Sequence, residues 1–271
     1  MPFKVYAEIA LLVIVGIWVG GFLSIRLVRA LSGGRAKIGS IVLFVLFVAG
    51  VLFLGSVFLP CFSLNDSVIC HGPRSEKIIA LTFDDGPNEP YTSRVLDLLE
   101  ARKIPATFFL VGKNVERYPD VVHRMLREGY PVGNHTWDHR PLIWMGPEEI
   151  RGEVEKWEEA MASTGLPLPS LKLFRAPHGW KTPFVSRVLH DKGYRLVGWS
   201  RGVWDSDQPG TAVLFRRLTR GIGSGDIILL HDGGEARAGI DRSQTVEVLP
   251  EIIDHYQSLG FRFVSLQEVL E

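Results

Sequence analysis

Carboxylates and imidazoles occur in this sequence at spacings that could hold a metal ion beside a base. Asp84 and Asp85 are adjacent, and His135 and His139 are four residues apart. Two histidines separated by one helical turn can bind the same metal ion, and a carboxylate completes a ligand set that leaves positions open for water, as in catalytic zinc sites. Because adjacent Asp side chains point in different directions, one can bind the metal while the other acts as a base.

His231 comes much later in the chain and is a candidate general acid for a leaving group. A weak base is enough to generate hydroxide at such a site, because zinc lowers the pKa of its bound water to about 7. Metal, base and acid together predict metal-assisted hydrolysis of an acyl bond. The sequence has no Ser or Cys nucleophile elbow, which argues against a covalent acyl-enzyme.

Short apolar segments rich in β-formers are expected to position these residues. Seven segments have this character: 78–83, 107–111, 131–134, 171–174, 194–200, 226–230 and 261–265. Amphipathic stretches of helical length lie between them: 92–103, 147–163, 182–192 and 245–258. This alternation predicts an α/β fold, a distorted (β/α) barrel of about seven parallel strands with right-handed crossovers. An open doubly wound sheet is the alternative, and no GxGxxG run favours dinucleotide binding.

The candidate residues follow the ends of the predicted strands. Asp84 and Asp85 follow the first, His135 and His139 the third, Arg175 the fourth, Asp205 comes shortly after the fifth, and His231 ends the sixth. Active sites of α/β barrels are built at the carboxyl ends of the strands, so these residues are expected at one mouth. The six Glu residues of segment 148–159 are interpreted instead as a solvated helix face.

Four runs of the sequence resemble four of the five ordered motifs of the polysaccharide deacetylase family, which is carbohydrate esterase family 4 or the NodB-homology domain. The runs are TFDDGP at 82–87, HTWDH at 135–139, RAPHG at 175–179 and LLH at 229–231. The resemblance covers about residues 76–271. It implies a distorted barrel of about seven strands and a metal-dependent hydrolase that removes N-acetyl or O-acetyl groups from sugars.

The resemblance also implies the metal site. Asp85 resembles the family's metal-binding carboxylate, and His135 and His139 resemble its other ligands. One divalent ion is therefore expected, with Zn²⁺ as the default, while Co²⁺ or Ni²⁺ would suit the same ligands.

Catalytic roles follow in the same way. Asp84 resembles the general base, His231 the general acid, and Arg175 the arginine that orients and polarises the base. The backbone N–H of His178 matches the family's oxyanion donor, and such a donor is typically worth about 3 kcal/mol.

Two departures from the family pattern stand out. The family usually has an aromatic residue where this chain has His178. Its fourth motif is usually Asp-x-x-Asp-Trp, whereas alignment here gives GVWDS at 202–206. Asp205 then matches the second Asp, which in the family supports the acid His231 and would keep it protonated near neutral pH. Asp207 is an alternative to Asp205, and Trp204 either takes the role of the lost Trp or packs in the core.

Two uncharged runs precede this domain, residues 9–25 and 38–59. A membrane span needs roughly 20 apolar residues, so the second run can span alone and the first can span if Tyr6 and Ala7 are included. A cleaved signal peptide is the alternative for the first run. The basic residues between the runs are Arg26, Arg29, Arg35 and Lys37, and the positive-inside rule places them in the cytoplasm.

The organisation expected from these runs is a cell-membrane protein with two spans and a short basic cytoplasmic loop in 1–60, a neck in 61–75 and an extracytoplasmic catalytic domain in 76–271. Cys61 and Cys70 are the only cysteines, and they either form a disulfide in the neck or stay as free thiols.

The expected partners are the lipid bilayer and a glycan or a lipid-linked saccharide. Acidic and basic residues balance at 30 each, so no nucleic acid is expected. A deacylase or deformylase of a lipid-linked sugar is the alternative within the same chemistry. Two other function classes remain open, a glycan-binding membrane protein that has lost catalysis and a structural membrane protein whose spans are its function. The oligomeric state is also open.

Overall fold

The computed structural model describes residues 20–22, 26, 34–64 and 68–270. The strands are β1 (Ile78–Asp84), β2 (Thr107–Leu110), β3 (Val132–Asn134), β4 (Leu173–Phe174), β5 (Arg195–Leu196), β6 (Arg201–Gly202), β7 (Asp226–His231) and β8 (Arg262–Val264). The helices of the domain are α3 (Tyr91–Arg102), α4 (Gly112–Arg117), α5 (Pro119–Arg127), α6 (Pro147–Ser163), α7 (Pro183–Asp191), α8 (Thr211–Thr219), α9 (Ser243–Ser258) and α10 (Leu266–Leu270). Short 3₁₀ turns occupy Leu142–Trp144, Pro177–Gly179 and Asp205–Asp207.

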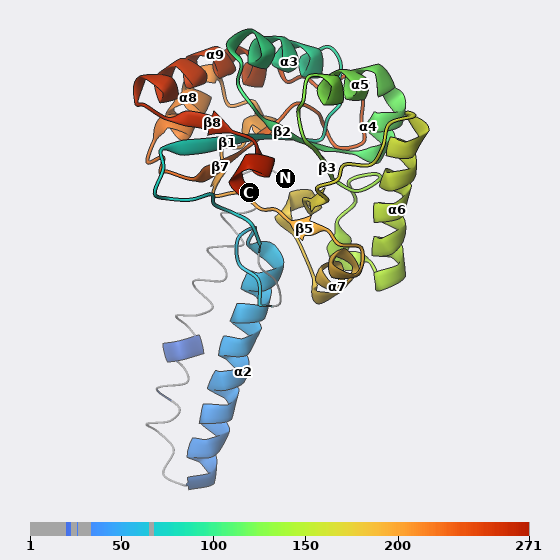
Figure 1. The fold of residues 1–271 in the computed structure, drawn as a ribbon. Helices are drawn as coiled ribbons and strands as arrows, with labels where there is room; N and C mark the ends of the chain where they lie inside the picture. The colour runs from blue at the N-terminus through green and yellow to red at the C-terminus, as the bar shows by residue number, and fades with distance from the viewer. Residues whose placement is uncertain (1–19, 23–25, 27–33, 65–67, 271) are drawn as a thin grey trace.

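The strands form one parallel sheet in the order β5-β4-β3-β2-β1-β7-β6. β1 lies at its centre and pairs with β7 along one edge. Along its other edge, β8 pairs with residues 78–80 and β2 with residues 82–84. Helices α3, α5, α8 and α9 lie along one side of the domain (Figure 1). The predicted α/β fold with parallel strands curled into a distorted barrel is confirmed.

Only Arg195–Leu196 (β5) of the predicted segment 194–200 forms a strand, and β6 follows just beyond that segment, at the opposite end of the sheet. β5 pairs with β4, while β6 pairs with β7, so the chain crosses the open side of the barrel between them. Close contact with the preceding neck explains the break. A Cβ atom on Gly198 would lie 2.6 Å from the Pro60 carbonyl oxygen, so only glycine fits this approach.

The core is built from β1 and its neighbours, and every residue of β1 is buried. Phe83 and Phe108 are register partners on β1 and β2, and their rings stack with centroids 5.1 Å apart. Trp157 of α6 is buried and donates its indole N–H to the Leu110 carbonyl at 2.7 Å. Burying one such aromatic side chain stabilises the fold by about 1.5–3 kcal/mol. These contacts fix the carboxyl ends of the strands that carry the polar candidates.

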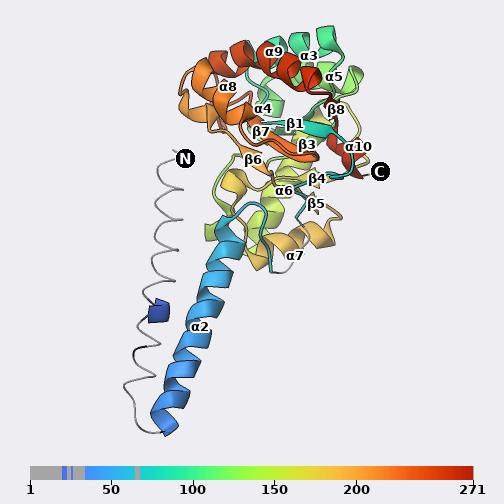
Figure 2. The same cartoon turned by 90° about the vertical axis from the view of Figure 1, so that its left-hand side faces the viewer.

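A long helix, α2 (Gly34–Phe58), projects from the domain as a separate rod in both views (Figures 1 and 2). Within it, Ile41–Phe58 has a mean hydropathy of 2.9 and is almost entirely unburied, and it is the one helix among the described residues that is long and apolar enough to cross a membrane. The other predicted span, residues 9–25, lies outside the described residues except for 20–22. Cys61 and Cys70, just beyond α2, form a disulfide.

Candidate active site

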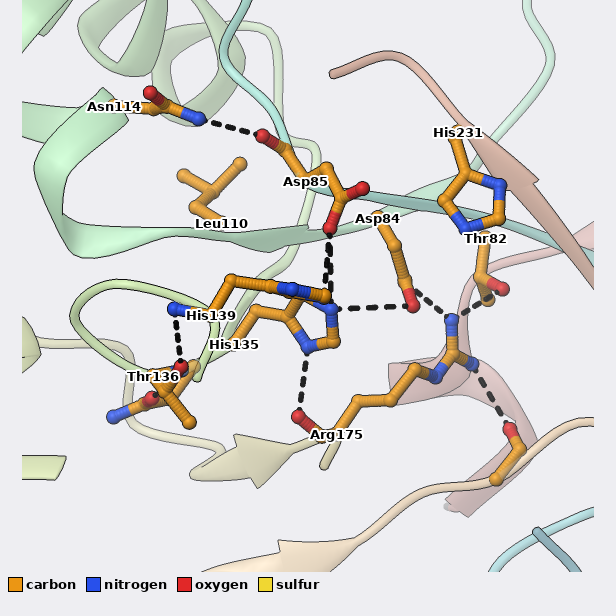
Figure 3. A network of polar contacts seen from close by, with 12 residues as sticks. Thr82, Asp84, Asp85, Leu110, Asn114, His135, Thr136, His139, Arg175 and His231 are labelled. Carbon is orange, nitrogen blue, oxygen red and sulfur yellow. Dashed lines mark hydrogen bonds and ion pairs between the residues drawn. The ribbon is translucent and has the colours of Figure 1, made fainter. Parts of the chain in front are cut away.

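Asp85, His135 and His139 come together as a buried cluster at the carboxyl ends of β1 and β3. Asp85 Oδ1 lies 3.4 Å from His135 Nε2 and 3.2 Å from His139 Nε2. Figure 3 shows both imidazoles directed at this one carboxylate. The three side chains are at most 8% exposed, so the cluster is closed to bulk water on most sides.

The two histidines do not lie on a helix, and the helical explanation of their spacing is wrong. They stand on an irregular loop after β3, in which Thr136 and His139 have positive φ angles of 67° and 62°. Local hydrogen bonds hold this turn: Asn134 Oδ1 accepts from the Thr136 N–H at 2.8 Å, and Thr136 Oγ1 accepts from the His139 N–H at 3.0 Å. Non-glycine residues with positive φ are costly and concentrate at functional sites.

Glu153 of α6 supports the same loop, although the sequence indicated a solvated helix face for it. Its side chain is 2% exposed, and its Oε2 accepts hydrogen bonds from the backbone N–H groups of Trp137 and Asp138 at 3.1 and 3.3 Å. A buried carboxylate must be compensated, and Arg140 also donates to Oε1 at 2.7 Å. The i, i+4 spacing of Glu153 and Trp157, both inward-facing, is the sequence signal that identifies this face.

His135 is held in one orientation by a contact on its other ring nitrogen. Nδ1 lies 2.8 Å from the Arg175 carbonyl oxygen, which can only accept a hydrogen bond. Nδ1 therefore carries the proton and leaves the Nε2 lone pair directed at Asp85. Such backbone contacts are the usual means of orienting a metal-binding histidine.

Arg175 and Asp84 form a fully buried ion pair beside this cluster. Arg175 Nη1 donates to Asp84 Oδ1 at 2.6 Å and to Thr82 Oγ1 at 2.8 Å, while Nη2 donates to the Gly198 carbonyl at 2.9 Å. The guanidinium also lies over the Phe109 ring at 4.1 Å. Burial lowers the pKa of Arg175, against the opposing effect of Asp84. Asp84 Oδ1 is thus occupied, whereas Oδ2 faces His135 Nε2 at 3.6 Å (Figure 3).

His231, at the end of β7, is paired with Asp205. Its Nδ1 lies 2.8 Å from Asp205 Oδ1, and its backbone N–H donates to Asp205 Oδ2 at 2.8 Å. Burial lowers the pKa of His231, but the Asp205 charge and hydrogen bond outweigh burial and raise it above its usual value. Burial alone would raise the pKa of Asp205. Its charge interaction and hydrogen bonds with His231 outweigh burial and hold this pKa below its usual range.

Of the two acidic residues considered for the altered fourth motif, Asp205 is the one in contact with His231. Thr245 of α9 donates from Oγ1 to Asp205 Oδ2 at 2.8 Å, so both oxygens of this carboxylate accept hydrogen bonds. Sequence reasoning missed Thr245, because it is one polar residue on an amphipathic helix and belongs to no motif. Asp207 lies on the wall of the cavity instead.

The clusters share one cavity of about 330 Å³. Its wall includes Asp84, Asp85, His231, His178, Trp199 and Trp204. His178 and Trp204 both have a φ of 59°, and both are partly exposed. Burial lowers the pKa of His178 to about 4, so its ring is neutral at physiological pH. Two of the residues in this wall, Trp199 and Trp204, carry indole rings.

Another buried carboxylate in this region, Asp232, was not predicted. It follows His231 and is fully buried; Oδ2 accepts a hydrogen bond from Thr92 Oγ1 at 2.6 Å, and Oδ1 has no partner among the described residues. Burial raises its pKa to about 7. A Cβ on Gly86 would lie 2.3 Å from Oδ2, so the glycine that follows Asp85 is required for this packing.

The donor set fits a divalent metal ion. One ligand atom from each of Asp85, His135 and His139 lies within 4.8 Å of the others. Asp85 Oδ1 and His139 Nδ1 are buried and have no hydrogen-bond partner among the described residues. Such orphaned polar atoms are costly unless something else satisfies them, and a cation would satisfy the carboxylate oxygen. Two imidazoles and a carboxylate suit zinc, cobalt or nickel better than magnesium or calcium.

Comparisons with known proteins agree with this geometry. Residues 71–197 match the family model for polysaccharide deacetylase. The chain is 39% identical over 210 residues to a peptidoglycan-N-acetylglucosamine deacetylase of Bacillus cereus, covering 73% of this chain and 90% of that protein. It is 35% identical over 199 residues to a chitooligosaccharide deacetylase of Rhizobium leguminosarum bv. trifolii, covering 71% of this chain and 92% of that protein.

A solved peptidoglycan N-acetylglucosamine deacetylase has a similar structure, with a TM-score of 0.69 and 29% identity. The match covers 74% of this chain and 92% of the solved one. The motifs, the fold and these relatives lead to one conclusion: the chain is a member of the polysaccharide deacetylase family.

Proposed function

We propose that this protein is a membrane-anchored, metal-dependent hydrolase that removes acetyl groups from the amino sugars of a glycan outside the cytoplasm. The observation that carries the proposal is the buried Asp85–His135–His139 cluster, which shares one cavity with the Arg175–Asp84 and Asp205–His231 pairs. A protein that only binds glycans needs no such combination of a metal site, a base and an acid. The relatives named for peptidoglycan and chitooligosaccharide support N-acetylglucosamine as the sugar.

Asp85, His135 and His139 are the residues that would hold the metal. When bound there, a divalent cation supplies a Lewis acid that polarises the acetyl carbonyl and acidifies a water molecule. Zinc is the ion that we propose, because its usual ligands are imidazole nitrogens and carboxylate oxygens. The chain itself contributes the orientation of His135, through the Arg175 carbonyl.

Asp84 acts as the general base in this proposal. Arg175 holds its Oδ1, so Oδ2 is left to accept the proton of the attacking water. The water oxygen forms a bond to the acetyl carbon, and negative charge develops on the carbonyl oxygen. The backbone N–H of His178 is the proposed donor to that oxygen, in a turn that the positive φ of His178 shapes.

His231 is the proposed general acid. Because Asp205 holds Nδ1, the proton to be transferred is on Nε2. Collapse of the tetrahedral intermediate breaks the carbon–nitrogen bond, and His231 protonates the leaving nitrogen as the free amine forms. Acetate and the deacetylated sugar are the products. Trp204 is proposed to contact the sugar from the cavity wall.

Membrane anchoring is part of the proposal. α2 supplies one span, the run at 9–25 a second, and the basic residues between them a cytoplasmic loop, which leaves the neck (61–75) and the catalytic domain (76–271) outside. The Cys61–Cys70 disulfide supports this side of the membrane, since structural disulfides persist in oxidising compartments.

Acetate release from N-acetylated chito-oligosaccharides by the full-length protein in detergent tests the function. We expect activity in the metal-loaded protein, loss after chelation, and recovery with Zn²⁺, Co²⁺ or Ni²⁺. Asp84→Asn serves as the inactive control, and its circular dichroism spectrum checks that the fold is kept. Activity that survives complete removal of metal, or metal-loaded protein that releases no acetate from any N-acetylated glycan, would overturn the proposal.

A further inference from the structure

The end of α2 is seated directly on the loop that carries His178. Lys181 lies in that loop and is 3% exposed. Its backbone N–H donates to the Val57 carbonyl at 3.0 Å, and its Nζ donates to the Leu59 carbonyl at 2.5 Å. The last carbonyls of a helix have no partner within the helix, and a cation is favourable at that end. The catalytic domain thus supplies the C-terminal cap of the proposed membrane span.

Aromatic contacts continue from the end of α2 to the Asp85–His135–His139 cluster. The Phe58 and Trp180 rings meet edge to face with centroids 5.4 Å apart. The Trp180 and His178 centroids are 5.1 Å apart, and those of His178 and His139 are 4.8 Å apart. Three ring contacts therefore separate the last residue of α2 from a proposed metal ligand. These ring contacts place the site within roughly 15 Å of the end of the span, just beyond the polar interface of one leaflet, which is roughly 5–8 Å deep.

The neck between α2 and the domain is packed as well. A disulfide joins Cys61, three residues beyond the end of α2, to Cys70. Next to Cys70, the Ile69 N–H donates to the Leu196 carbonyl at 3.0 Å, and the Gly198 N–H donates to the Ile69 carbonyl at 2.9 Å. These bonds add the neck to the sheet beside β5. No extended flexible linker joins α2 to the domain in the described part of the chain.

The packing of α2 and the neck against the domain restricts which glycans can reach the cavity. A deacetylase that works through a thick polymer needs a linker that carries its site away from the bilayer, because reach grows with linker length. With α2 as a membrane span, the packed junction holds the site close to the membrane surface. We propose, resting on the deacetylase function and the membrane anchoring proposed above, that the substrate is a saccharide still attached to a membrane lipid and not a finished polymer.

Three probes in one assay test this substrate class. The full-length protein is reconstituted into phosphatidylethanolamine–phosphatidylglycerol vesicles with an N-acetylated chito-oligosaccharide linked to a polyprenyl phosphate. The same oligosaccharide in free form and insoluble chitin are the comparisons. We expect the lipid-linked form to be deacetylated with a kcat/KM about tenfold or more above the free form, since both partners share one surface. Chitin is expected to react in detergent but not with vesicle-bound enzyme.

A second variant, called the released variant, tests whether the packing of α2 against the domain restricts the substrate, or whether attachment to the membrane alone does. It combines Lys181→Met with an insertion of about twelve Gly and Ser residues after Phe58, which extends the reach by roughly 20 Å. We expect it to act on the free oligosaccharide as before and to gain activity on chitin in vesicles. Lys192→Met is the matched control, because that ammonium pairs with Glu155 and Glu158 of α6, and it should change neither property.

The outcomes distinguish the two proposals. Vesicle-bound wild type that deacetylates chitin and the free oligosaccharide as well as the lipid-linked form overturns the substrate class and leaves the deacetylase function intact. Failure on all three probes overturns both. Should the released variant lose activity on the free oligosaccharide, its fold is damaged, and the three-probe comparison of the wild type then decides alone.

Discussion

Asp205 accepts two hydrogen bonds from His231, one from the ring Nδ1 and one from the backbone N–H, both at 2.8 Å. One carboxylate therefore fixes both the position of the residue and the tautomer of its ring. It also sets the charge, because it opposes burial and raises the pKa of the imidazole. In the proposed mechanism His231 must be protonated, so this pairing sets the upper pH limit of activity.

Replacing Asp205 by Asn is expected to move that limit. The amide keeps a hydrogen bond to Nδ1 but carries no charge, so the pKa of His231 falls and the acid form is lost at a lower pH. The alkaline limb of the kcat profile should shift toward acid, with kcat reduced more than KM is changed. An unchanged profile would show that another residue supports His231.

The Asp205–His231 pair also makes the free energy of unfolding depend on pH. The pKa of His231 is raised in the folded protein, so its protonation stabilises the fold fully below the unfolded value, near 6.5, and this stabilisation is lost as pH rises through the folded pKa. Asp205 acts in the opposite sense, because its pKa is lowered: its contribution is lost as pH falls through the folded value. Urea unfolding of wild type and Asp205→Asn across both ranges measures the two effects.

Paired substitutions of Asp84 and Asp85 separate the base from the metal ligand. Asp85→Asn removes the carboxylate that both imidazoles face, and we expect loss of bound metal together with activity. Asp84→Asn should retain the metal and lose turnover, since Arg175 can still hold the side chain through its oxygen. Metal content by inductively coupled plasma mass spectrometry, alongside acetate release, checks both. Loss of metal from Asp84→Asn alone would reverse the assignment.

Arg175→Met should destabilise the fold severely. It leaves Asp84 as a buried charge without its partner, and such losses cost about 3–5 kcal/mol. Arg175→Lys is not expected to restore the loss, because a single ammonium cannot reach Thr82, Asp84 and the Gly198 carbonyl together. Urea midpoints of the metal-free proteins measure the effect. Near wild-type stability in Arg175→Lys would contradict the claim that the planar guanidinium is required.

The strands and the order of the polar groups could be predicted from the sequence, because apolar segments ending in Asp, His or Arg repeat along the chain. The loop from His135 to His139 could not: the i, i+4 spacing suggested a helix, whereas side-chain hydrogen bonds hold Thr136 and His139 at positive φ. The termination of the predicted strand 194–200 at Leu196 also escaped prediction. It depends on contact between Gly198 and Pro60, which are far apart in sequence.

Buried polar residues on helices were also difficult to predict from the sequence. Glu153 stands among more exposed glutamates of α6, and in the sequence only its i, i+4 spacing to Trp157 distinguishes it from them. Thr245 supports Asp205 from α9 and lies outside every motif. Thr245→Val keeps the side-chain volume and leaves one oxygen of Asp205 without that donor. It should cost about 1–3 kcal/mol of stability, and Thr245→Ser should recover most of it.

Asp232→Asn is expected to stabilise the metal-free protein at alkaline pH. Burial raises the pKa of this carboxyl to about 7, so the folded state binds its proton more tightly than the unfolded state does. The stabilisation is fully present below the unfolded pKa, near 3.9, and is lost as pH rises through about 7. An amide mimics the protonated acid and still accepts from Thr92. The variant should therefore lose less stability than wild type between about pH 4 and 7 in urea unfolding, and parallel curves for the two proteins over that range would refute a buried neutral acid at this position.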